Sequence, residues 1–199
     1  MQQLAAHELL DESYWGDGIG ARWIVGQRGT FVGKCEIIAG IGGSLIVHGD
    51  YDLCRFACYG DRADAWARLR WMADCTDVSY YVAQKASIGL RNQDVVEYDE
   101  DVAVAGLRER LADERQEHDV DQEMLEFLEG ALAHTENQHE LRRYLAEEGS
   151  RWDAWEWDVG KVLSYRVVVS HVALNRCAWL LRARYGYAGP PACRRKEAA

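Results

Sequence analysis

The spacing of apolar residues changes near residue 60, and this change is the strongest constraint on the fold. Before it, short runs rich in Val, Ile and aromatic residues are separated by glycine-bearing turns such as "GQRGT", "GIGG" and "GDY", which is typical of antiparallel strands. After it, apolar residues recur every three or four positions, as on one face of a helix. The sequence predicts an α+β fold, in which a small antiparallel sheet in the N-terminal third is followed by and packed with several helices.

Caps and turn residues place the expected elements along the chain. A β-meander covers 20–60, with strands at "ARWIV", "FVGKCEIIA", "GSLIVH" and "DLCRFACY". Helices cover 61–185, and Ser164 can cap the last of them, which runs to about Arg184. The β-branched run "RVVVS" in that segment leaves a strand open as the alternative. The two earliest helices are expected to begin after Asp61 and Asp77, the second of them ending at Gly89.

The composition is that of a folded chain with one core. Of 199 residues, 48% are apolar, with eight Trp and ten Tyr, unlike disordered sequences. We predict a single domain over 1–199 with a frayed tail at 190–199. Because no leader peptide and no run of about 18 apolar residues is visible, we expect a soluble, cytoplasmic protein. Six scattered cysteines fit reduced thiols better than a disulfide framework.

Charge is concentrated in the middle of the chain. From 94 to 158, 21 acids stand against 6 Arg, a net charge of −15, whereas the remainder has 12 acids and 17 bases, a net charge of +5. The total of −10 argues against a general nucleic-acid binder, which neutralises phosphates with Lys and Arg. Glu109, Asp113 and Glu117 are spaced by four, which places them on one helix face, and we expect this face to bind a partner. The apolar residues at helical spacing in this segment include Leu107, Leu111, Met124 and Leu128.

The stretch "LIVHGDYDLCRFACYG" combines a histidine, two aspartates and two cysteines, a set that can bind a metal. If its second half is a strand, Cys54 and Cys58 lie roughly 13 Å apart at about 3.3 Å per residue, too far for one ion or a disulfide. Cys54, Phe56 and Cys58 then form one buried apolar row. Since the turn residues of "HGDYD" favour a hairpin, we predict no metal and no cofactor.

Catalytic motifs have little support in the sequence. His134 and His139 are five residues apart, so on a helix they point about 140° away from each other, unlike the pair of a zinc-binding helix. "GIGGSL" lacks the final glycine of a dinucleotide loop and leads into a strand. No G-x-S-x-G elbow or phosphate loop ending in Lys-Ser or Lys-Thr occurs. We predict no catalytic residue; the alternative is an enzyme acting on a small molecule or nucleotide through His48, Asp50 and Asp52.

Four acids in "VVEYDEDVAVAGLRERL" come just before a helical pattern, where the amide end of the helix dipole favours negative charge. We prefer this role to a paired-carboxylate active site. The four residues are Glu97, Asp99, Glu100 and Asp101.

The stretch "SRWDAWEWDVGK" interleaves three tryptophans with acids. Trp152 and Trp155 can share a helical face and pack inward, while Trp157 lies elsewhere. Core packing is the favoured interpretation, and an aromatic anchor for a partner is the alternative, since Trp is enriched in binding hot spots. The three tryptophans and the acidic helix face are therefore the candidate partner-binding residues.

Three runs, "GGSLIVHGDYDLCRF", "LRWMADCTDVSYYVAQKASIG" and "KVLSYRVVVSHVALNRCAWLL", resemble uncharacterised proteins of tailed phages and prophages from GC-rich bacteria. The resemblance covers 37–89 and the last helix, and it transfers no catalytic residue. It implies a phage gene product that acts in the bacterial cytoplasm.

Small phage proteins without catalytic motifs often inhibit host defence complexes, so this class suggests a non-catalytic inhibitor of CRISPR type, whose acidic helices occupy a basic channel meant for nucleic acid. The expected partner is a host protein or ribonucleoprotein complex, with no direct contact to nucleic acid or membrane, and self-association is left open. A structural phage component is a further alternative.

Overall fold

The computed structural model of the chain describes residues 6–29, 33–40, 43–50, 53–58, 64–75, 86–88 and 95–193. Contacts group the chain into two compact units: unit 1 comprises Met1–Val95 and Leu163–Ala199, and unit 2 comprises Val96–Val162. Sheet and helices together confirm the α+β class. That the chain is a single domain stays a prediction, because two units that the chain connects twice can still unfold in one cooperative step.

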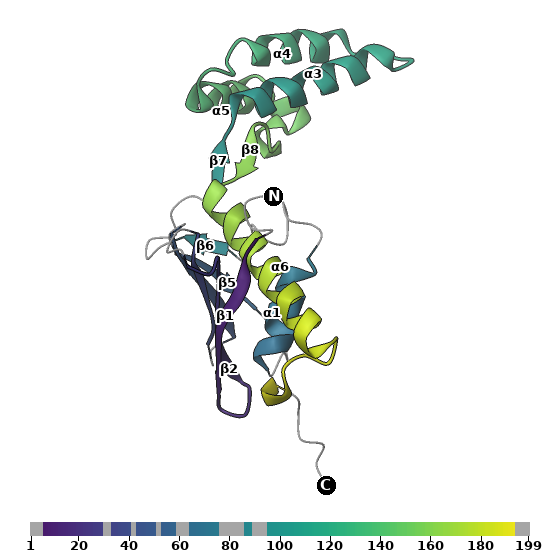
Figure 1. Cartoon of the computed structure of the whole chain (residues 1–199). Coiled ribbons are helices and arrows are strands. Elements are labelled where there is room, and N and C mark those ends of the chain that lie inside the picture. The colour runs from purple at the N-terminus through teal and green to yellow at the C-terminus, as the bar shows by residue number, and fades with distance from the viewer. Residues whose placement is uncertain are drawn as a thin grey trace. The chain divides into compact units, whose positions relative to one another are not determined.

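Unit 1 contains a six-stranded antiparallel sheet whose strands follow one another in chain order (Figure 1). Each strand pairs with its predecessor, so the expected meander is confirmed. The strands are β1 (Glu8–Trp15), β2 (Gly20–Gly26), β3 (Cys35–Ala39), β4 (Ser44–Gly49), β5 (Cys54–Ala57) and β6 (Ala86–Ile88).

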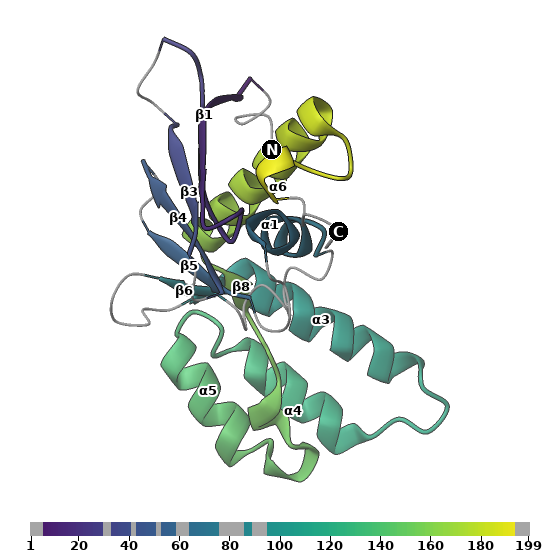
Figure 2. The same cartoon turned by 90° about the horizontal axis from the view of Figure 1, so that it is seen from below.

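One face of this sheet is apolar because the register aligns every second residue of neighbouring strands. Both helices of unit 1 described here, α1 (Ala65–Ala73) and α6 (Tyr165–Tyr185), lie on that face (Figures 1 and 2). Each large side chain buried there contributes about 1.5–3 kcal/mol. One row across the strands is Trp23, Ile37, Val47 and Cys54, and the next is Ala21, Ala39, Leu45 and Phe56.

Polar contacts attach α6 to α1. His171 Nε2 lies 2.9 Å from the Met72 carbonyl, which can only accept, so the ring proton is on Nε2. Burial lowers the pKa of His171, and the ring is therefore neutral at physiological pH. Arg182 donates to both carboxylate oxygens of Asp74 at 2.6 Å. Ser164 Oγ accepts from the Val167 N–H at the start of α6, so the predicted cap and helix are confirmed, and the alternative strand is not formed.

Unit 2 consists of helices and short turns between two strands that pair with each other. Asp99, Asp121 and Asn137 each accept backbone N–H groups at the start of a helix, which satisfies donors that the helix leaves free. Of the four acids predicted just before this helix, Asp99 is its cap, Glu100 and Asp101 lie in its first turn, and Glu97 lies in a strand. The elements are β7 (Val96–Tyr98), α3 (Glu100–Gln116), α4 (Gln122–Leu132), α5 (Gln138–Glu147), the 3-10 turns η3 (Ser150–Trp152) and η4 (Ala154–Glu156), and β8 (Lys161–Leu163).

The core of unit 2 is formed by the apolar faces of its three helices. Leu107, Leu128 and Leu141 are at most 2% exposed, and partly buried aromatic residues surround them. Leu111 is also buried, and Met124 packs against this core. The predicted amphipathic helices are therefore confirmed.

Several local predictions differ from the structure. Helix α1 begins after Asp64, which accepts from the Ala67 N–H at 2.7 Å, so Asp64 rather than Asp61 is its cap; Asp61 lies outside the described residues. The helix expected after Asp77 is wrong at 86–88, where β6 pairs with β5, and its other residues lie outside the described ranges. Sheet pairing there overrides the local pattern.

The C-terminal segment and β1 also differ from expectation. The 3-10 turn η5 (Pro191–Cys193) packs against unit 1, whereas we expected fraying from 190; residues 194–199 lie outside the described part. Strand β1 was not predicted, because its acids interrupt the apolar alternation of an edge strand that buries little of its surface.

The predicted row of Cys54, Phe56 and Cys58 is buried, as expected. Cys54, Phe56 and Cys58 are 0%, 0% and 6% exposed, and all six cysteines are free thiols. Among the described residues, no group of three or more His, Cys, Asp or Glu is placed to hold a metal ion. No described helix has the length and apolar character needed to cross a bilayer.

Burial predicts which thiols react slowly. It raises the pKa of Cys35 and Cys193 to about 11, and that of Cys177 well above its ordinary value, so at about pH 8 roughly one Cys35 thiol in a thousand is ionised. We expect these three residues to react with a disulfide reagent only on unfolding, and the partly exposed Cys75 to react first. Peptide mapping after timed labelling measures the order; rapid labelling of Cys177 in the native protein would contradict this packing.

The helical core of unit 2 predicts that truncation of Leu107 lowers the stability of the protein strongly. Truncation of this fully buried residue in Leu107→Ala should lower the free energy of unfolding by about 2–5 kcal/mol. Glu109→Ala, an exposed position two residues on in the same helix, should change it by less than about 0.5 kcal/mol. Urea denaturation followed by circular dichroism compares the two variants, and equal stabilities would refute the packing described.

Candidate functional site

The acidic part of the sequence coincides with a structural unit. Unit 2 carries 20 Asp and Glu against 7 Lys and Arg, a net charge of −13, while the rest of the chain has 13 acids and 16 bases, a net charge of +3. Because like charges on one compact unit add their fields, its surroundings attract cations over about one Debye length.

Two adjoining cavities of about 420 and 200 Å³ lie along α3 and share Arg110 and Asp113. The first is bounded by α3 and by 158–160, and the second by the C-terminal half of α3, by α4 and by Trp157. We call them together the acidic groove. Its charged residues are Glu109, Arg110, Asp113, Glu114, Glu117 and Asp158, and its apolar residues include Met124, Leu128 and Trp157.

The structure brings the three predicted acids of this surface into one groove. Glu109, Asp113 and Glu117 are all exposed, and each lines at least one of the two cavities. The predicted common helix face is wrong for Glu117, which follows the last helical residue and has extended backbone angles. It lies beside Asp113 at the groove, but beyond the helical turn that the spacing of four assumed.

Arg110, like Glu114 and Asp158, is a charged residue of the acidic groove that sequence reasoning missed. Its guanidinium carbon lies 4.2 Å from the centroid of the Trp157 ring, a cation–π contact. Trp157 in turn meets Phe127 edge to face, with centroids 5.9 Å apart. The groove therefore already holds a guanidinium on an aromatic ring between carboxylates. A basic residue within an acidic helical face was the sequence signal for it.

The three tryptophans do not share one environment. Trp152 stacks on Phe127 with centroids 5.0 Å apart, and Trp157 contacts the same ring, whereas Trp155 is 60% exposed. The predicted inward pair of Trp152 and Trp155 is therefore wrong. The reason is Asp153, whose left-handed backbone (φ 51°) separates η3 from η4, so the segment does not keep the register of one α-helix.

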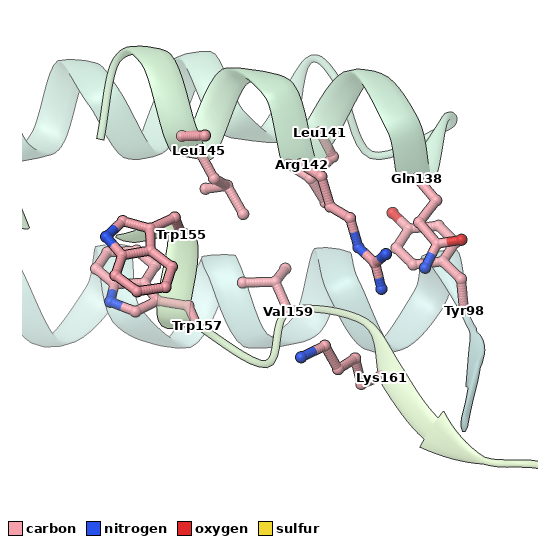
Figure 3. A pocket seen from close by; sticks show the side chains of 10 residues that line it. Tyr98, Gln138, Leu141, Arg142, Leu145, Trp155, Trp157, Val159 and Lys161 are labelled. Atoms are coloured by element: carbon pink, nitrogen blue, oxygen red, sulfur yellow. The ribbon is translucent and has the colours of Figure 1, made fainter. Parts of the chain in front are cut away.

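A third cavity, of about 380 Å³, lies between α5 and the segment 155–161 (Figure 3); we call it the α5 cavity. Trp155, Trp157 and Leu145 form one end of it. At the other end, the Arg142 guanidinium lies near Gln138 and Tyr98, and the Lys161 ammonium group lies between the two ends, near Val159 (Figure 3). It shares Trp157 and Val159 with the acidic groove, but its charged residues are cations.

Tyr98 and Gly160 position the strand end of the α5 cavity. The Tyr98 hydroxyl donates to the Thr135 carbonyl at 2.5 Å, and burial, with the nearby charges of Glu100 and Asp99, raises the pKa of Tyr98, so it stays a neutral donor. Gly160 has φ +69°, and a Cβ there would lie 2.5 Å from the Tyr98 ring. Only glycine fits, because a side chain would be both strained and in collision.

The residues of the alternative enzyme site have structural partners. His48 Nε2 lies 2.5 Å from Glu36, whose pKa is lowered chiefly by its hydrogen bond from Arg22. Asp50 Oδ2 accepts from the backbone N–H of Gly33 at 2.5 Å and of Lys34. Asp52 lies outside the described residues.

The two histidines considered as a helical pair do not share a helix. His139 lies in α5, and His134 follows the end of α4 and contacts the Tyr144 ring, with centroids 4.8 Å apart. The angle calculated for one continuous helix therefore does not apply to them.

Comparison with protein-family models, curated proteins and solved structures finds no match for this chain. The resemblance to phage proteins therefore stays a prediction. The function has to be inferred from the charge and shape of the acidic groove and the α5 cavity.

The unequal burial of the tryptophans predicts unequal effects of their removal. Trp157→Ala removes the ring between Arg110 and Phe127 and should lower the free energy of unfolding by about 1–3 kcal/mol. Trp155→Ala, at an exposed ring, should change it by less than about 0.5 kcal/mol. Thermal and urea unfolding of both variants test this; a larger loss for Trp155→Ala would reverse the assignment.

Proposed function

We propose that this protein is a non-catalytic binding protein whose acidic groove engages a basic surface of a partner. The observation that carries the proposal is the grouping of Asp113, Glu114 and Glu117 with Trp157 at one cavity, beside the adjoining cavity lined by Glu109. Carboxylates beside an aromatic ring suit Arg and Lys side chains, which combine ion pairs with stacking on the ring.

Arg110 supports this choice of ligand chemistry. It shows in the same chain that a guanidinium fits over Trp157, with acids on the neighbouring helical turns. An arginine of the partner can extend this arrangement along Asp113 and Glu117, or replace Arg110 on the ring. Both modes predict a dependence on the acids and on Trp157, in addition to the general field of unit 2.

The partner we propose is a bacterial defence ribonucleoprotein of CRISPR type, in the bacterial cytoplasm that the sequence resemblance implies. Such complexes hold their guide–target duplex in a positively charged channel. A unit with a net charge of −13 is complementary to such a channel, and its occupation would exclude nucleic acid without any catalytic step. What supports this partner is charge complementarity together with the resemblance.

Charge reversal of the groove tests the proposal. Glu109→Lys, Asp113→Lys and Glu117→Lys combined should slow association with a purified effector complex by about tenfold or more, because complementary charges mainly accelerate encounter. The matched control is Glu126→Lys, Glu136→Lys and Glu147→Lys, which makes the same charge change at exposed residues of unit 2 that do not line the groove. Surface plasmon resonance at several salt concentrations measures both.

The outcomes separate the groove from the general field. A much larger effect of the groove variant than of the control supports the groove as the interface. Equal effects would mean that only the net charge of unit 2 matters. Absence of binding by the unmodified protein would remove this class of partner.

A further inference from the structure

The α5 cavity has the size and lining of a ligand site. Its volume of about 380 Å³ is within the range of pockets that bind small ligands, which are mostly apolar with a few placed polar groups. The two tryptophan rings and Leu145 lie at one end and the Arg142 guanidinium lies at the other (Figure 3). A ligand that fills it therefore needs an apolar part and an anionic part.

Arg142, on α5, is the cation of the α5 cavity that has no ion pair with a described residue. Arg115, Arg151 and Lys161 of unit 2 each pair with an acid, whereas Arg108, Arg110, Arg142 and Arg143 form no ion pair within the described part of the chain. Among these four, Arg142 is the one whose guanidinium lies at the α5 cavity (Figure 3). Its planar guanidinium can donate two parallel hydrogen bonds to a carboxylate.

Lys161 adds a second positive charge that is held loosely. Its ammonium group pairs with Asp158, whose side chain is 79% exposed, and such exposed pairs contribute little. The ammonium can therefore turn towards an anion in the cavity at small cost. The surrounding charge of −13 favours a ligand with one negative charge over a phosphate ester with two, because each added charge is repelled by the unit.

The apolar end and Gln138 specify the rest of the ligand. The exposed Trp155 ring, with Leu145 and Trp157, offers a surface for an aromatic or large aliphatic side chain. The amide of Gln138 carries both a donor and an acceptor, which is what a peptide group requires. We propose that the α5 cavity binds the C-terminal end of a peptide, with its carboxylate on Arg142 and its last apolar side chain on Trp155.

This inference goes beyond the proposed function, because its ligand-binding residues Arg142, Gln138 and Trp155 do not line the acidic groove. Trp157 and Val159 border both sites. The test uses the full chain and four probes: N-acetyl-Leu-Phe with a free carboxylate, the same dipeptide as its C-terminal amide, 3-phenylpropionate, and adenosine monophosphate. Isothermal titration calorimetry should show saturable binding of the free acid and at least about tenfold weaker binding of the amide.

A matched pair of variants isolates Arg142. Arg142→Met should weaken binding of the free dipeptide by about tenfold or more, whereas Arg143→Met, which removes the same charge at an exposed neighbour that does not line the cavity, should leave it within about twofold. Trp155→Ala should weaken binding by about fivefold. Circular dichroism and thermal melting check that each variant is folded.

Several results would overturn the inference. The first is that the free dipeptide shows no saturable binding up to about 10 mM, a concentration above the dissociation constants of specific ligands. The second is equal binding of acid and amide, and the third is an equal effect of the two arginine variants. Binding of 3-phenylpropionate as tight as that of the dipeptide would identify a site for small aromatic acids instead. Tighter, Arg142-dependent binding of adenosine monophosphate would identify a phosphate site.

Discussion

The alignment of apolar residues across the strands of unit 1 is the constraint on which the rest of the structure depends. Because each strand pairs in register with the one before it, Trp23, Ile37, Val47 and Cys54 form one continuous row that only a second apolar layer can cover. Helices α1 and α6 supply that layer. They come from segments almost a hundred residues apart, so the chain can form unit 2 between β6 and α6 without interrupting the sheet.

Unit 2 has a different constraint, because it folds with a net charge of −13. Its helices place their leucines inward, and the ring of Phe127 brings together Tyr144, Trp152 and Trp157. The acids remain at the surface, and two of them, Asp99 and Asp121, cap helix starts. Trp157 belongs both to the core, through its contact with Phe127, and to the charged surface, because the Arg110 guanidinium lies over its ring. The acidic groove thus forms where Trp157 packs onto this core beside the acids of α3.

The segment that follows α5 separates two surfaces of opposite character. Towards α3 it borders carboxylates, and towards α5 it borders Arg142 and Lys161. The proposed site for a basic surface and the proposed site for a peptide carboxylate therefore lie on the two sides of this segment. This arrangement needs Trp157 and Val159 at the boundary and Gly160 at the close approach to Tyr98.

The sequence by itself determined the features that depend on neighbours along the chain. The change of apolar period, the acids at the start of the helix near residue 100 and the helix after Ser164 were predictable, because caps and helical faces involve residues only a few positions apart. Tertiary structure decided the rest. β1 and β6 exist because a sheet edge offers backbone partners to segments with weak propensity. Trp155 faces outward because the left-handed Asp153 breaks the helical register. Arg142 and Lys161 meet at one cavity because the chain reverses after α5, a long-range encounter that no local pattern encodes.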